Sequence, residues 1–132
     1  MTLNGARVAL SEALQSITDL RCHPTFPQRL DPPACFVGAM TRDPAQEFAG
    51  GSTVSFEVFV CVSPVELARQ VHVLDGFADA TGDTSVEAAI NADPTLSGAV
   101  SSAVVTQVQS PVQVEVAGLP LLAAQFTVEV FL

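Results

Sequence analysis

The stretch TVSFEVFVCVS, residues 53–63, decides the fold because its side chains alternate with a period of two. Strict alternation predicts a β-strand, and the even-numbered valines with Phe56 are expected to face a core. The other set mixes Glu57 with Phe59 and Cys61. That mixture is typical of a strand face that a neighbour half covers.

Two helices are predicted directly after this strand. Ser63-Pro64-Val65-Glu66 has a capping residue, a proline suited to the first helical position and an acid that completes a capping box. The apolar stripe continues to Ala78, and the helix is expected to end near Gly82. Thr84-Ser85-Val86-Glu87 repeats the capping pattern, and Asp93-Pro94 should end a second, shorter helix.

Alternation returns in the C-terminal part of the chain. We expect strands over 100–108, 112–116 and 122–130, with a turn at Ala117–Pro120 between the last two. In this hairpin, Gln113 and Glu115 are expected to lie opposite Thr127 and Glu129 on an outer face.

Upstream of residue 53, the apolar spacing from Leu3 to Ile17 predicts an amphipathic helix, followed by short strands at 20–23 and 34–40. Prolines make 24–33 an extended loop, and Thr41–Gly51 is a second, long loop. The whole chain, 1–132, is therefore predicted to be a single α+β domain. It should hold one mixed or antiparallel sheet, with the N-terminal helix and two central helices packed against it.

Composition indicates a protein that hides apolar surface against partners. Apolar residues make up 48% and charged residues 14% of the chain, whereas an ordinary soluble domain carries roughly 25% charged residues. The most apolar window, Val116–Ala124, contains Gly118 and Pro120 and is far shorter than a membrane span. The N-terminus has no uninterrupted apolar segment typical of a signal peptide. Oligomerisation is the favoured explanation.

The charge of the chain argues against a protein that grips nucleic acid. Fourteen acidic residues oppose five arginines, lysine is absent, and the net charge is −9. Phosphate neutralisation by Lys and Arg supplies most of the affinity for DNA, so no basic binding stripe can form. A ring of such subunits would instead present an acidic bore through which DNA passes without sticking.

No reaction site is predicted. Cys22-His23, Cys35, Cys61 and His72 lack the close pairing of zinc ligands, and adjacent residues of a strand point to opposite faces. Asp75, Asp79 and Asp83 do not match the calcium-loop pattern and are interpreted as a solvated acidic face. No nucleophile elbow or phosphate loop is present. We therefore expect no catalytic residue, no cofactor and no metal, and reduced thiols in a cytoplasmic protein.

Taken together, the segments resemble the tail-terminator proteins of long-tailed bacteriophages of actinobacterial hosts. The resemblance spans nearly the whole chain and is one of order and spacing rather than of a diagnostic motif. Besides the amphipathic first helix and the proline-rich loop, it rests on ACFVGAM (34–40), STVSFEVFVCVS (52–63), LDGFAD (74–79), TSVEAAINADPTLSGAV (84–100) and VQVEVAGLPLLAAQFTVEVFL (112–132).

The resemblance implies a structural virion protein that is made in the host bacterial cytoplasm. It would form a hexameric ring that caps the completed tail tube, ends tail polymerisation and joins the tail to the head-side connector. Its partners would be further copies of itself, the tail-tube protein and the connector. DNA would pass through the ring without specific binding, and no membrane would be involved.

Six residues are candidates for these contacts. Phe48, Phe59 and Phe131 are candidate subunit or partner anchors, and Glu57, Glu115 and Glu129 are candidates for an acidic sheet face or bore. For Phe59 and Phe131 the competing interpretation is packing within one subunit. The loop that holds Phe48 is either an arm that reaches a partner or a mobile segment.

Three other functions stay open. A head-closure or head–tail adaptor protein of the phage neck shares the size and the ring. A small ligand-binding α+β domain would need a pocket with convergent titratable groups. An enzyme would need a site of a kind that the sequence does not reveal.

Overall fold

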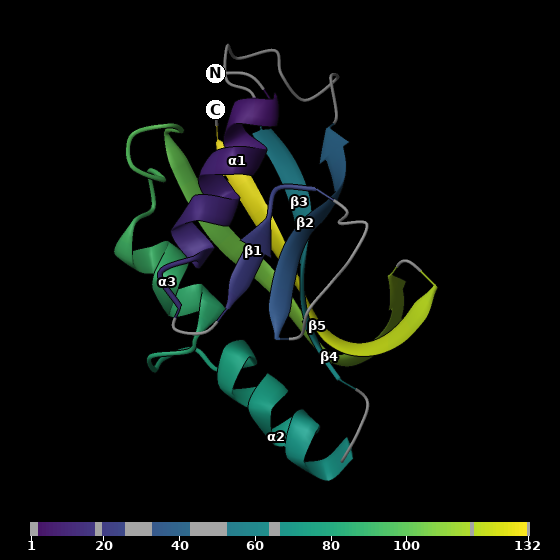
Figure 1. Ribbon diagram of the computed structural model, residues 1–132. Coiled ribbons are helices and arrows are strands. Elements are labelled where there is room, and N and C mark those ends of the chain that lie inside the picture. The colour runs from purple at the N-terminus through teal and green to yellow at the C-terminus, as the bar shows by residue number, and fades with distance from the viewer. Residues whose placement is uncertain are drawn as a thin grey trace.

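The computed structural model describes residues 3–17, 20–25, 33–42, 53–63, 67–116 and 118–131. These residues form an α+β fold, as predicted, with three helices and five strands (Figure 1). In chain order the elements are α1 (Leu3–Leu14), β1 (Arg21–His23), β2 (Ala34–Arg42), β3 (Thr53–Val62), α2 (Leu67–Ala78), α3 (Val86–Ala92), β4 (Ser102–Val116) and β5 (Leu119–Phe131).

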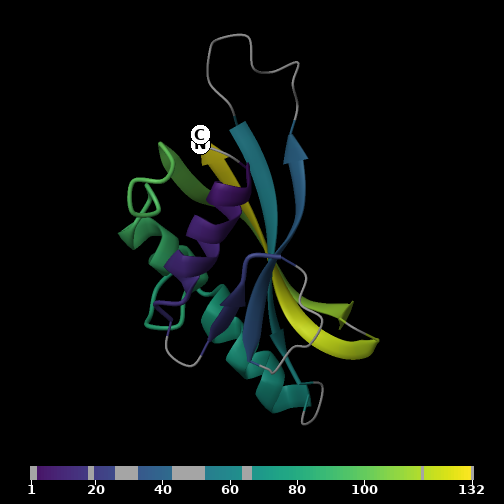
Figure 2. The same ribbon diagram turned by 45° about the horizontal axis from the view of Figure 1, so that its top comes forward.

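The five strands form one mixed sheet in the order β1-β2-β3-β5-β4. β1 runs parallel to β2, and every other neighbouring pair is antiparallel. The predicted strand at residues 53–63 lies in the centre, where it pairs with β2 on one side and with β5 on the other. The helices lie on one side of the sheet, and the turn end of the β4–β5 hairpin curves away from them (Figure 2).

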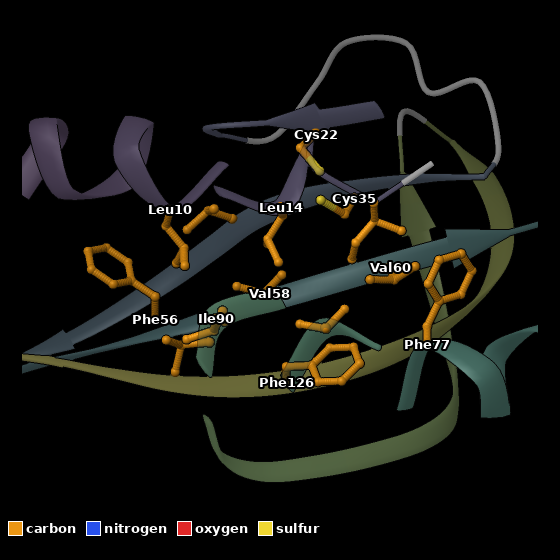
Figure 3. Close-up of a cluster of buried hydrophobic side chains, with 14 of the residues drawn as sticks. Leu10, Leu14, Cys22, Cys35, Phe56, Val58, Val60, Phe77, Ile90 and Phe126 are labelled. Carbon is orange, nitrogen blue, oxygen red and sulfur yellow. The ribbon is translucent and has the colours of Figure 1, made fainter. Parts of the chain in front are cut away.

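The main core fills the space between the sheet and the helices (Figure 3). The even-numbered residues of β3, including Phe56, Val58 and Val60, are buried there, as their alternation predicts. Leu10 and Leu14 of α1 contribute from the helical layer, and Figure 3 also labels Phe77, Ile90 and Phe126 in this core.

The first helix is anchored to the sheet by a charged side chain. Arg7 Nη1 donates hydrogen bonds to the carbonyl oxygens of Val37, at 2.9 Å, and Gly38, at 2.6 Å. Successive carbonyls of a regular strand point to opposite sides, but β2 is irregular here because its register against β3 shifts between Val37 and Met40. The Arg7 guanidinium also lies 5.3 Å from the ring centroid of the buried Phe56. One residue of α1 therefore binds the bulge of β2 and covers an aromatic ring of the core.

The helix boundaries differ from the sequence prediction at two places. α2 ends at Ala78 rather than near Gly82, and the Asp79 carboxylate then accepts a hydrogen bond from the Ala80 amide. The N-cap of α3 is Ser85, whose hydroxyl accepts from the Ala88 amide at 3.0 Å, so the predicted capping box at Thr84 is wrong. The reason is that the buried Ser85 hydroxyl also donates to the Asp79 carbonyl, which fixes it at the cap. Pro64–Glu66, the predicted start of α2, lie outside the described residues.

The C-terminal hairpin also corrects two expectations. Residues 102–116 form one continuous strand, not two, because β4 is an edge strand that accommodates Pro111 within a register shift between Gln109 and Val112. Val116 pairs with Leu119, so the connection is shorter than predicted and Gly118 adopts a φ of +81°. The short connection sets the register, which places Gln113 opposite Leu122 and Glu115 opposite Pro120.

Candidate functional site

The side of the sheet opposite the helices, here called the second face, holds most of the predicted contact residues. Its polar half lies on β3 and β5, where Ser55 pairs with Glu129 and Glu57 pairs with Thr127. Glu57 and Glu129 are therefore diagonal neighbours on one face. The Gln125 amide donates to a Glu57 carboxylate oxygen at 3.3 Å. The structure thus brings two of the three predicted acids together.

Glu115 does not belong to this group. It pairs with Pro120 near the hairpin turn, and residues 120 and 129 of β5 point to opposite sides of the strand because they differ by an odd number. The expected acidic face of Glu57, Glu115 and Glu129 is therefore wrong for Glu115. The cause is that Glu115 lies beside the hairpin turn, whereas Glu129 lies near the far end of β5, where it pairs with Val104.

The other half of the second face is a small apolar cluster, separate from the main core. Its buried members come from β2, β3 and the hairpin: Ala34, Phe36, Cys61, Val116, Leu121 and Ala123. The half-buried ring of Phe59 stacks on Phe36, with centroids 5.2 Å apart and an angle of 23° between the planes. Gly38 lies against this ring, since a Cβ there would be 3.0 Å from Phe59 Cε2. Phe59 therefore has contacts within its own subunit.

Phe131 is the predicted anchor that lies most open. Its side chain is 39% exposed, and so is that of Val104 on the neighbouring strand. Phe131 pairs with Ser102 and Glu129 pairs with Val104, so the two apolar side chains are diagonal neighbours on the second face. Of the predicted arm Thr41–Gly51, Thr41 and Arg42 belong to β2, whereas residues 43–51, with Phe48, lie outside the described residues.

The thiols are buried, and two of them face each other. Cys22 and Cys35 are register partners on β1 and β2, and their sulfurs point toward one another (Figure 3). The hydrogen bond with Cys22, followed by burial, raises the pKa of the Cys35 thiol well above its ordinary value. Burial alone raises the pKa of Cys61 from 9.0 to about 12. Such thiols stay protonated at neutral pH and are poor nucleophiles.

The candidates for metal binding do not converge in the described part of the chain, where no three His, Cys, Asp or Glu side chains lie close enough to hold an ion. Asp75 is exposed on α2, whereas Asp79 and Asp83 follow the end of that helix and are also exposed. These positions match the predicted solvated acidic surface.

Two shallow grooves are lined by described residues. The first, of about 300 Å³, is lined by residues of α1 and α3 and of the segment after α3, among them four alanines, Glu12 and Asp93. The Asp93 carboxylate accepts hydrogen bonds from the amide and the hydroxyl of Ser97. The second, of about 350 Å³, has Arg69 and Gln70 beside Val62 and Val73. Neither groove brings together the several titratable groups expected of a small-molecule site.

Within the described residues, no helix has the length and apolar character needed to cross a membrane. Comparison with known proteins gave no match, either to a family model or to a curated protein sequence.

Proposed function

We propose that this chain is a structural subunit of a ring at the head-proximal end of a phage tail, as its resemblance to tail terminators implies. In this role about six copies would cap the tail tube, end its polymerisation and join it to the head-side connector. The observation that carries the proposal is the second face of the sheet, which the helices leave uncovered and which holds Glu57 and Glu129 as diagonal neighbours near the exposed Phe131.

Electrostatics supports the passage of DNA through such a ring. Six copies with a net charge of −9 each carry −54 in total. A bore of this sign repels phosphate, so DNA moves through without being held. Glu57 and Glu129 are the acids that we assign to this bore, whereas Glu115 is assigned to the opposite side of the sheet.

The stoichiometry is the first test. Light scattering coupled to size exclusion, followed by negative-stain imaging, should give a closed ring of about six subunits, either alone or after addition of tail tubes. A ring that binds tube ends favours a terminator, and one that binds only the isolated connector favours a neck adaptor. A chain that stays monomeric at every concentration, with and without tubes, contradicts the proposal.

A charge reversal tests the bore. Glu129→Lys should raise affinity for double-stranded DNA at low salt by about tenfold in the ring, because six new cations then face the bore. Glu115→Lys is the matched control, since it adds the same charge on the other side of the sheet. Equal DNA affinity of the two variants would argue against the assignment of the second face to the bore.

A further inference from the structure

The two edges of the sheet differ in how well they are protected against pairing with a further strand. At the β1 edge, β1 pairs only with Ala34–Phe36 of β2. The next two carbonyls of β2, those of Val37 and Gly38, accept hydrogen bonds from Arg7. A short edge strand and a charged side chain are both devices that keep a sheet from pairing with another chain. This edge is therefore blunted over 34–38.

The β4 edge has a different character. β4 has 15 residues and, within the described part of the chain, pairs with β5 alone. No charged residue occurs between Asp93 and Glu115. Long, uncharged edge strands are templates for pairing with another strand. Register shifts at Thr106 and beside Pro111 interrupt β4, so its outer edge suits a short partner strand rather than a long one.

Exposed apolar side chains flank the first half of this edge. Val104 and Phe131 lie on the second face, and Val108, which pairs with Phe126, lies on the helical side. These three are among four large apolar side chains exposed in the described residues, each between 37% and 39%. Open backbone groups with apolar side chains on both sides are the usual components of a strand-to-strand interface.

We infer that the outer edge of β4 over Ser102–Gln109 binds an extended segment of a second copy of this chain, with Val104, Val108 and Phe131 packed along the contact. The inference deepens the proposed function, because it names the surface through which copies associate.

A second copy of the chain meets the least electrostatic repulsion at this edge. Two copies with a net charge of −9 each repel one another over most of their surfaces. They can approach at Ser102–Gln109, because this segment contains no charged residue. The nearest acid on the neighbouring strand is Glu129 of β5, which lies one strand away from the outer edge. A basic foreign segment would instead be attracted to Glu57 and Glu129, the diagonal neighbours on β3 and β5.

The experiment compares Val104→Lys and Val108→Lys with Gln113→Lys by sedimentation velocity across protein concentrations. All three substitutions add a lysine at an exposed position of β4. Gln113→Lys is the control, because Gln113 lies beyond Pro111 and therefore outside the proposed contact at Ser102–Gln109. We expect the dissociation constant of the assembly to rise at least tenfold for the first two variants and to be unchanged for the third. Hydrogen exchange should show the amides of Ser102–Gln109 protected in the assembly and unprotected in Val104→Lys.

The outcomes separate this inference from the ring. A closed ring that forms equally well in all three variants overturns the β4 contact and leaves the ring proposal standing. A dimer that Val104→Lys and Val108→Lys dissociate supports the β4 contact and contradicts the ring. A protein that is monomeric in every sample overturns both.

Discussion

Removal of the Arg7 guanidinium should destabilise the fold markedly. Arg7→Met keeps the apolar stem and removes the donors that bind the Val37 and Gly38 carbonyls at 2.9 and 2.6 Å. Hydrogen bonds from a charged donor contribute about 1.5–3 kcal/mol each, and the contact with the Phe56 ring adds about 0.5–1 kcal/mol. Because Arg7 is only partly buried, water can replace part of this. We expect a loss of about 3 kcal/mol.

The assay is urea denaturation followed by far-UV circular dichroism, since the chain has no Trp or Tyr. In thermal unfolding of a domain of this size, a loss of about 3 kcal/mol in the free energy of unfolding corresponds to a decrease of roughly 10 °C in Tm. Arg7→Lys is the control, because its ammonium keeps the charge and, like Nη1, can donate to both carbonyls, but it lacks the planar guanidinium that lies over the Phe56 ring; it should lose about half as much. An Arg7→Met protein within about 0.5 kcal/mol of the wild type would refute the anchoring role.

Three further perturbations follow from the packing and the titratable groups. Above pH 9 the Cys61 thiol ionises in the unfolded chain but, with a pKa of about 12, not in the fold, so stability falls as pH rises from 9 toward 12. Between pH 8.5 and 10.5, the free energy of unfolding of Cys61→Ala should therefore fall by about 2 kcal/mol less than that of the wild type, as measured by denaturant titrations. If the unfolding free energies of both proteins depend on pH in the same way, the prediction is contradicted. Gly38→Ala places a Cβ 3.0 Å from Phe59 Cε2 and should lower the free energy of unfolding by about 1–2 kcal/mol. In a double-mutant cycle, Phe59→Leu should relieve this loss. If the effects of the two substitutions simply add, there is no clash between the two side chains. Ser85→Ala removes the cap of α3 and the bond to the Asp79 carbonyl, and we expect thermal unfolding to report a loss of about 1–2 kcal/mol, with Ser85→Thr closer to the wild type.

The elements could be predicted from the sequence wherever one period was strong. Two patterns depend only on burial of one face: the alternation at residues 53–62 and the helical stripe beginning at Leu3. They can therefore be recognised without knowing which element packs against that face. The single sheet with helices on one side followed from the order of these elements.

The register could not be predicted in the same way. It depends on the short connection between Val116 and Leu119 and on bulges at Thr106 and beside Pro111, which local patterns do not reveal. Glu115 was placed opposite Glu129 without this register; its position beside the turn pairs it with Pro120, on the other side of the sheet.

The anchoring residue was missed although the sequence contains a sign of it. Leu3, Arg7, Leu10 and Leu14 follow helical spacing, so a cation stands within an apolar stripe. A charge at such a position needs a partner in the fold. The sequence does not indicate that the partner is a pair of strand carbonyls, because the bulge in β2 arises only when β2 pairs with β3.

The strand order has a consequence for biosynthesis. β5 is synthesised after the other strands of the described sheet, yet it lies between β3 and β4 and is hydrogen-bonded to both. Until residues 119–131 emerge, the apolar side chains of the nascent β3 lack one of their two neighbouring strands, and β4 has none. The sheet therefore cannot be completed before residues 119–131 have emerged, and a chain shortened before Leu119 would expose β3 to chaperones and proteases.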